Sequence, residues 1–297
     1  MKRRGPDFIV FGAGKSGTTS LHRYLAQHPG IFMAQKKEPR FFALDDHGRY
    51  PDLGSNAPLR LVQDLERSSV ADWDAYCQMF EGALPTQLAG EVSPLYLFTS
   101  RAPAKIHRLL PSVALIAVLR HPVDLALSAF KMNVRNGYET MTRFEEAVPL
   151  RGAASGEGWR WKLYIEQAMH GRNLQRFFDL FPAQQLKVFL FDDLRTDPNC
   201  VVNAIFEFLG LESGLKIDVA ARHNVGLEPR FSPGLRSAAR RIVPEPILAH
   251  LRNGFRGLAR KGVQMPASLR SEYLPVFRED VLLLQDLLDR DLSDWLR

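Results

Sequence analysis

A run of small and hydroxyl-bearing residues follows a short apolar segment near the start of the chain. The apolar segment is Phe8-Ile-Val-Phe11, and the run is Gly12-Ala-Gly-Lys-Ser-Gly-Thr-Thr-Ser20. A strand that enters such a turn at the start of a helix leaves free backbone N–H groups and the positive end of the helix dipole facing one point. Lys15 adds a full positive charge, and the hydroxyls of residues 18–20 add further donors. The pattern predicts a site for a phosphate-bearing ligand.

The turn does not match the phosphate loop of nucleoside triphosphatases, in which a lysine follows the second of two glycines separated by four residues. With Gly12 as the first glycine, Gly17 falls correctly but is followed by Thr18, and in the other alignment Ile9 replaces the first glycine. Such enzymes also use an acidic residue at a second strand end to hold Mg²⁺. Here the strand expected over residues 112–119 is followed by Arg120. A cation at that place suits a second phosphate better than a metal.

Apolar segments alternate with segments of helical spacing along much of the chain, and this alternation predicts the elements that position these residues. Strands are expected at residues 8–11, 31–33, 88–92, 113–119 and 186–191, and helices at 17–27, 72–80, 103–110, 122–136, 161–180 and from 198 onward. Apolar strands alternating with helices indicate a mostly parallel sheet that is covered on both faces. We therefore expect an α/β, P-loop-like three-layer fold that forms a single domain over residues 1–297.

Five short blocks, which follow one another in a specific order, resemble the sulfotransferases that use 3′-phosphoadenylyl sulfate (PAPS). The blocks are Lys15-Ser-Gly-Thr-Thr-Ser20, Glu38-Pro-Arg-Phe-Phe42, Glu91-Val-Ser-Pro-Leu-Tyr96, Leu119-Arg-His-Pro-Val-Asp124 with Ser128, and Arg260-Lys-Gly262. They are most similar to the Golgi glycan branch of that family, the heparan sulfate N- and 3-O-sulfotransferases, and to its soluble bacterial relatives. The resemblance runs from about residue 8 to Trp295, with a poorly matched stretch near residues 210–258.

The resemblance implies a set of residues that hold PAPS as the donor and adenosine 3′,5′-bisphosphate as the product. The 5′-phosphosulfate is expected on the first block, and the 3′-phosphate on the fourth, with a late loop that closes over the same phosphate. The expected binding residues are Lys15, Ser16, Gly17, Thr18, Thr19, Ser20, Arg120, Ser128, Arg260, Lys261 and Gly262. Lys15 is also expected to neutralise charge on the bridging oxygen, and no metal is required because lysine and backbone donors meet that charge.

Sulfuryl transfer also needs a base for the acceptor proton, and the sequence leaves two candidates. Glu38 matches the position that serves as base in the glycan sulfotransferases, whereas Glu91 lies at a strand end, where the active sites of open α/β sheets collect. We prefer Glu38; the alternative for Glu91 is a structural carboxylate. The family usually has lysine where Val92 stands, so part of the relatives' acceptor machinery is missing. Lys36 and Lys37 suggest an anionic acceptor, and the acceptor itself is a glycan, a lipid or a small molecule.

The composition of the chain indicates which kind of partner and which cellular compartment to expect. The chain has 297 residues and a formal charge of +6, with 39 Lys and Arg against 33 Asp and Glu, a mild excess that does not require nucleic acid. Its two cysteines, Cys77 and Cys200, have no metal or disulfide spacing, which favours a reducing compartment. The first apolar stretch is too short for a membrane span. We therefore expect a cytoplasmic, bacterial protein without the anchor that the Golgi relatives carry.

Two other functions remain open. The first is a nucleotide kinase or other NTPase with a degenerate phosphate loop. The second is a non-catalytic module that binds phosphorylated ligands through the basic stretch at residues 230–261. The same stretch is alternatively a peripheral membrane contact, a surface for an acidic acceptor or a solvated basic face.

Overall fold

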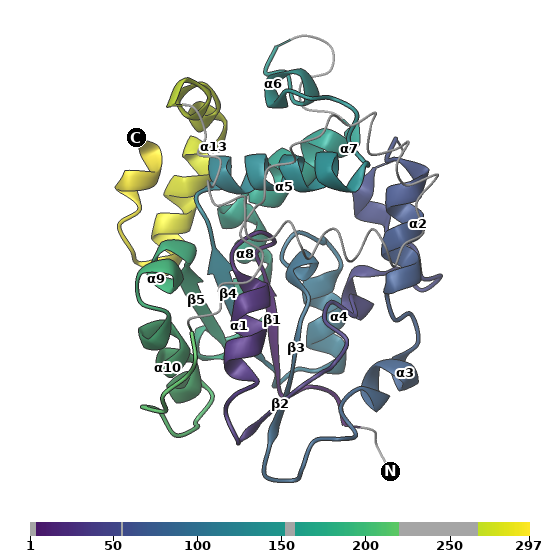
Figure 1. Cartoon of the computed structure of the whole chain (residues 1–297), viewed down its shortest axis with the longest axis vertical. Coiled ribbons are helices and arrows are strands. Elements are labelled where there is room, and N and C mark those ends of the chain that lie inside the picture. The colour runs from purple at the N-terminus through teal and green to yellow at the C-terminus, as the bar shows by residue number, and fades with distance from the viewer. Residues whose placement is uncertain (1–3, 55, 152–157, 220–266) are drawn as a thin grey trace, which may run out of the picture.

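The computed structural model describes residues 4–54, 56–151, 158–219 and 267–297. Five parallel strands form one sheet in the order β2-β3-β1-β4-β5 (Figure 1). The strands are β1 (Phe8–Gly12), β2 (Ile31–Met33), β3 (Leu88–Val92), β4 (Ala114–Leu119) and β5 (Leu186–Leu190). Because β1 lies between β3 and β4, the segments that follow these three strands meet at one edge of the sheet.

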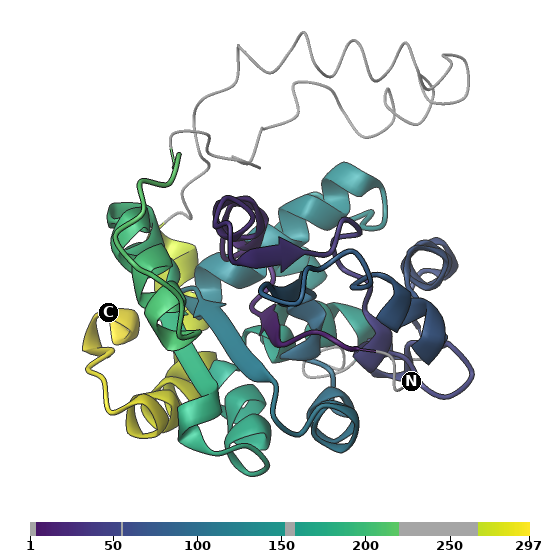
Figure 2. The same cartoon turned by 90° about the horizontal axis from the view of Figure 1, so that it is seen from below.

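Helices cover both faces of the sheet, as Figures 1 and 2 show. The longer ones are α1 (Thr18–Leu25), α2 (Leu59–Ser68), α4 (Ala102–Leu109), α5 (Pro122–Asn136), α8 (His170–Phe178), α10 (Pro198–Phe208) and α13 (Ala267–Leu288). The shorter ones are α3 (Trp73–Gln78), α6 (Phe144–Ala147), α7 (Gly158–Arg160) and α9 (Phe191–Thr196). This arrangement confirms the predicted three-layer fold. The single-domain assignment stays a prediction, because it also covers residues 220–266, which lie outside the described residues.

The alternation of side chains along β1 divides the core into two clusters. Phe8 and Val10 pack with α1 and α10 on one face, whereas Ile9 and Phe11 pack on the other face with α5, α8 and α13. All four side chains are completely buried. Burial on both faces explains why the strand is a continuous apolar run.

The helix predicted over residues 161–180 is wrong as a single element. Residues 161–165 form a π-helical turn and residues 166–168 a 3-10 turn, and α8 begins only at His170. Asp280 of α13 accepts the backbone N–H groups of Gly171 and Arg172, both at 2.9 Å, and so caps α8 from outside. A Cβ atom at Gly171 would lie 2.4 Å from the Asp280 carbonyl oxygen, so only glycine permits this contact. Packing against α13 therefore decides where the helix starts.

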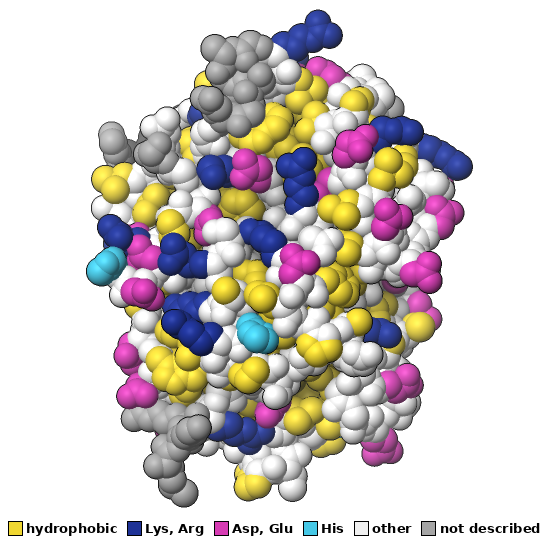
Figure 3. All heavy atoms as spheres, turned by 180° about the vertical axis from the view of Figure 1, so that it is seen from behind, with side chains coloured by type: hydrophobic (Ala, Val, Ile, Leu, Met, Phe, Trp, Pro, Cys, Tyr) yellow, Lys and Arg dark blue, Asp and Glu magenta, His cyan; other side chains and the backbone are white. Residues whose placement is uncertain are grey.

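One face of the molecule shows how charged side chains are distributed over the described residues. On the face that Figure 3 shows, Lys and Arg side chains are interspersed with Asp and Glu and with hydrophobic side chains. Among the helices of the described part of the chain, none combines the length and hydropathy needed to cross a bilayer. The basic stretch at 230–261 lies outside the described residues, so its predicted contacts stay predictions.

Candidate active site

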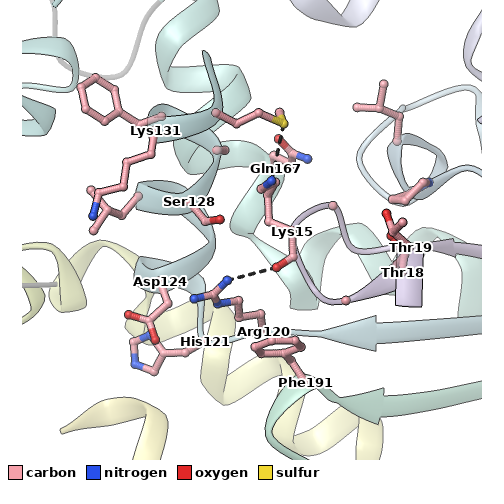
Figure 4. A pocket seen from close by; sticks show the side chains of 18 of the residues that line it. Lys15, Thr18, Thr19, Arg120, His121, Asp124, Ser128, Lys131, Gln167 and Phe191 are labelled. Atoms are coloured by element: carbon pink, nitrogen blue, oxygen red, sulfur yellow. Dashed lines mark hydrogen bonds between the residues drawn. The ribbon is translucent and has the colours of Figure 1, made fainter. Parts of the chain in front are cut away.

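A cavity of about 1950 Å³ opens at the sheet edge where β1 and β4 end. It is lined in part by the turn after β1, by the start of α1, by residues 127–136 of α5 and by the segment that follows β5. Figure 4 shows Lys15 and Arg120 approaching this space from two neighbouring strand ends. Ligands of open α/β sheets bind at this kind of place, outside the carboxyl ends of strands where the direction of chain progression changes.

Lys15 lies in the left-handed region of backbone conformation, with φ of 64°, and its ammonium group projects into the cavity. Its Nζ atom lies 3.6 Å from the sulfur of Met132 on α5. Burial, together with the nearby cations Arg135 and Arg120, lowers the pKa of Lys15 to about 8. An anion placed in the cavity would oppose these effects and hold the lysine in its charged form.

Gly17 occupies the residue before α1, with φ of 79°, a conformation that glycine adopts without steric cost. A Cβ atom there would lie 3.1 Å from Phe191 and from Leu194, so the turn packs closely against α9. The N-cap residue of α1 is Gly17, which has no side chain to cap the helix. Because the first N–H groups of a helix have no partner within the helix, the start of α1 suits an anion.

The side chains of the first block do not all face the cavity. Lys15, Gly17, Thr18, Thr19 and Ser20 line it, as the sequence predicts. The Ser16 side chain is completely buried and does not line the cavity, so its predicted role in binding is not supported by its position. Its hydroxyl instead donates a hydrogen bond of 3.4 Å to the carbonyl of Gly14.

Arg120 follows β4 and joins the two strand ends directly. Its Nη1 donates a hydrogen bond of 3.1 Å to the backbone carbonyl of Lys15, and its guanidinium carbon lies 5.0 Å from the centre of the Phe191 ring. Burial lowers the pKa of Arg120, and Asp124 opposes this effect. Ser128, two turns along α5, faces the same space as Lys15 and Arg120 in Figure 4.

Several residues that line the cavity were not identified from the sequence, and one aromatic residue and two arginines are among them. Phe191 directly follows β5, and Arg270 and Arg290 come from the C-terminal part of the chain. Arg270 binds both oxygens of Asp124 at 2.8 Å, and Arg290 binds Asp193 at 2.8 and 3.0 Å. The position of Phe191 at a parallel strand end was an available signal, whereas no sequence pattern marks the two arginines. Arg260, Lys261 and Gly262 lie outside the described residues.

Glu38 lies on the cavity wall, in the segment that follows β2. Its backbone N–H bonds to the carbonyl of Val92 at 2.9 Å, which ties this segment to the end of β3. Its carboxylate accepts hydrogen bonds from Lys37, at 2.6 Å, and from Arg40. Burial raises the pKa of Glu38, but Arg40 and Lys37 outweigh it and lower the pKa below its usual value. Glu38 is therefore ionised at neutral pH, and its charge also acts on Lys15.

Glu91 is completely buried and does not line the cavity, so its predicted catalytic role is not supported by its position. Its carboxylate accepts hydrogen bonds from Tyr76 at 3.0 Å and from Ser93 at 2.7 Å. Burial raises the pKa of Glu91 to about 7, against the effect of these hydrogen bonds. The Ser93 hydroxyl in turn accepts the backbone N–H of Arg40 at 3.1 Å. Glu91 therefore positions the turn that carries Glu38, and Glu38 is the candidate base.

Val92, which stands where the resembling enzymes usually have lysine, is fully buried in the smaller core cluster. No group of three or more His, Cys, Asp or Glu residues that could hold a metal ion occurs among the described residues. The cavity is lined by cations and backbone donors at strand ends and by carboxylates, of which Glu38 is the predicted base. The fold and this site define an α/β protein with a cavity at the strand ends that suits an anionic ligand.

Comparison with known proteins gives the family. Residues 6–214 match the model described as "Sulfotransferase family", and the chain belongs to that family. The chain is 24% identical over 220 residues to mouse heparan sulfate glucosamine 3-O-sulfotransferase 6, covering 71% of this chain and 54% of that protein. It is 26% identical over 216 residues to human bifunctional heparan sulfate N-deacetylase/N-sulfotransferase 3, covering 70% of this chain and 22% of that protein. The predicted resemblance to both kinds of heparan sulfate enzyme is confirmed.

A solved bacterial structure matches over nearly the whole chain. It is a sulfotransferase from Alicyclobacillus acidocaldarius, 28% identical, with a TM-score of 0.74 over 99% of this chain and 100% of the other. By contrast, the chain spans about half the length of the 3-O-sulfotransferases that it matches. The family agrees with the predicted enzyme class, a sulfotransferase. The donor and the acceptor of this chain belong to the proposed function.

Proposed function

We propose that this protein transfers a sulfuryl group from PAPS to a hydroxyl or amine of an acceptor and releases adenosine 3′,5′-bisphosphate. The observation that carries the proposal is the hydrogen bond of 3.1 Å between Arg120 and the Lys15 carbonyl. It brings the two predicted anion sites, which are 105 residues apart in the sequence, to one wall of one cavity. A ligand with phosphate groups at both ends of a ribose suits such a pair of sites.

The proposed donor contacts follow from charge and position. Lys15 and the N–H groups of residues 17–20 hold the 5′-phosphosulfate, and Arg120 with Ser128 holds the 3′-phosphate. Phe191, whose ring lies beside Arg120, offers an apolar surface to the nucleoside. The late loop at Arg260, Lys261 and Gly262 stays a prediction, as do a cytoplasmic location and a bacterial origin.

The proposed reaction is an in-line displacement at sulfur. The acceptor oxygen forms a new S–O bond while the bond between sulfur and the bridging phosphate oxygen breaks, and the bisphosphate leaves with that electron pair. Lys15 neutralises the charge that develops on the leaving oxygen. Glu38, which is ionised and lies on the cavity wall, receives the acceptor proton.

A nucleotide kinase or NTPase is the competing function. It is disfavoured because β4 is followed by Arg120, where an acidic ligand of Mg²⁺ would be expected, and because Thr18 stands in place of the loop lysine. Thermal shift distinguishes the two. We expect adenosine 3′,5′-bisphosphate to raise the melting temperature in the presence of chelator, and more than ATP with Mg²⁺.

The matched control uses adenosine 5′-monophosphate, which lacks only the 3′-phosphate. The wild-type protein should prefer the bisphosphate, and Arg120→Ala should lose most of that preference while still binding the monophosphate. A larger shift with ATP and Mg²⁺, or equal binding of the two adenosine nucleotides, would contradict the proposed donor.

A further inference from the structure

Beside its polar and charged side chains, the cavity is lined by a group of apolar side chains. We call this group the leucine wall. It consists of Leu53, Leu61, Leu65, Leu95, Met132 and Leu163. Three of the six side chains, Leu53, Leu61 and Leu163, are at most 7% exposed, so they are part of the packed interior as well as of the cavity.

Several separate elements contribute to the leucine wall, and one contact connects it to the proposed chemistry. Leu61 and Leu65 are four residues apart on α2, which places them on one side of that helix. Met132 lies on α5 and touches the Lys15 ammonium group at 3.6 Å. A molecule that rests on this wall therefore extends from the acceptor side of the cavity to the lysine that is proposed to hold the sulfuryl donor.

The charged side chains on the cavity wall include both signs. Lys37 and Arg40 both bind the Glu38 carboxylate, which offsets one of their two positive charges, and Arg135 also lines the cavity. The acidic Asp64 lines it as well and accepts hydrogen bonds from Arg67 and Tyr138, each at 2.8 Å. A chain of repeated carboxylate or sulfate groups would meet the carboxylates of Glu38 and Asp64 and the apolar side chains of the leucine wall as well as these cations. Burying such groups where they lack partners is costly.

We propose that the acceptor is an uncharged alcohol or phenol with an apolar body, whose hydroxyl reaches Glu38 while its body contacts the leucine wall. This inference rests on the proposed function and replaces the expectation of an anionic acceptor that Lys36 and Lys37 suggest. A cavity with an apolar lining and a few convergent polar groups is the usual form of a site for a small molecule. The polar group required for chemistry, Glu38, lines the same cavity as the donor side and the leucine wall.

The test compares acceptors of opposite chemistry. Purified full-length protein is given PAPS with 1-octanol, with 2-naphthol, or with an oligosaccharide of alternating glucuronic acid and glucosamine, and release of adenosine 3′,5′-bisphosphate is measured. We expect kcat/KM for at least one apolar acceptor to exceed that for the oligosaccharide by tenfold or more. The two apolar probes distinguish an alkyl from an aromatic body.

A pair of substitutions on α2 tests the surface itself. Leu65→Glu places a charge on the leucine wall and should lower kcat/KM for the preferred apolar acceptor at least tenfold. Val62→Glu is the matched control and should leave kcat/KM within threefold, because Val62 is partly buried on the same helix but does not line the cavity. Bisphosphate affinity should stay within twofold in both variants.

The outcomes separate the two proposals. A preference for the oligosaccharide, or a Leu65→Glu variant with unchanged kcat/KM, would overturn the apolar acceptor while leaving the donor assignment in place. Failure of the wild-type protein to bind adenosine 3′,5′-bisphosphate would overturn the donor assignment, and the acceptor inference with it. Loss of bisphosphate affinity in Leu65→Glu would also count against the inference, because the leucine wall would then not be specific to the acceptor.

Discussion

The two sides of the cavity are built in opposite ways. The donor side consists of backbone N–H groups, hydroxyls and cations that lie within two short segments, residues 14–20 and 120–128. The leucine wall on the acceptor side is apolar, and its members come from segments between residues 53 and 163. Phosphate recognition needs a fixed local geometry, which a strand end and the following helix provide by themselves. An apolar wall needs only shape, and distant elements can supply it.

This difference predicts that substitutions on the two sides of the cavity impair different functions of the protein. Changes on the donor side should weaken nucleotide binding, and changes at Glu38 or on the leucine wall should reduce turnover with little effect on nucleotide binding.

The largest effect on turnover is expected at Glu38, the proposed base. Glu38→Gln keeps the shape of the side chain but removes the base, so we expect kcat to fall by about 10²-fold or more. Affinity for adenosine 3′,5′-bisphosphate, measured by calorimetry, should change less than threefold. Equal loss of kcat and nucleotide affinity would show that Glu38 acts in nucleotide binding. That result would contradict the proposed division of the cavity into a donor side and an acceptor side.

Removal of either donor-side cation should come next. Lys15→Ala and Arg120→Ala each delete a charge-assisted contact worth about 1.5–3 kcal/mol, which corresponds to roughly a ten- to 150-fold loss in kcat/KM. Bisphosphate affinity should fall in both variants. Arg270→Ala is a useful control, because Arg270 lines the cavity but is already paired with Asp124. Full activity in both alanine variants would end the proposed donor assignment.

Glu91 should affect folding stability more than chemistry. Glu91→Ala leaves the buried hydroxyls of Tyr76 and Ser93 without their acceptor, so we expect the free energy of unfolding to fall by about 2–4 kcal/mol. Glu91→Gln keeps the volume and one acceptor, and should cost less. Denaturant unfolding measures both. If Glu91→Gln is fully stable yet loses kcat as strongly as Glu38→Gln, Glu91 takes part in the chemistry after all.

The smallest effect concerns pH. The pKa of Lys15 in the empty site is about 8, so the lysine is charged below that value and increasingly neutral above it. Because an anion prefers the charged form, the dissociation constant for adenosine 3′,5′-bisphosphate should rise several-fold between pH 7 and pH 9. In Lys15→Arg the guanidinium stays charged, so the same titration should be flat. A flat profile in the wild-type protein would show that Lys15 stays charged through this range and does not set the pH dependence.

Local patterns predicted the donor side better than the acceptor side. The turn at Lys15 and the arginine after β4 follow strands that are continuous apolar runs, and parallel strands place both ends at the same edge. The helix predicted over 161–180 was wrong because Asp280, more than a hundred residues away, caps α8 at Gly171. Ser16 and Glu91 have the right chemistry for a site, but the structure buries both. Exposure depends on packing, which a local pattern does not contain.

The sequence by itself determined the parallel sheet, the turn that suits a phosphate and the cation at the neighbouring strand end. Each of these depends on residues close together in the chain and on backbone geometry that such residues adopt locally. Only the tertiary structure decided that Glu38, and not Glu91, lines the cavity. It also decided that Arg120 bonds to the Lys15 carbonyl and that leucines from separate elements line the same cavity. These features depend on contacts between residues distant in the sequence, and those contacts exist only once the core is packed.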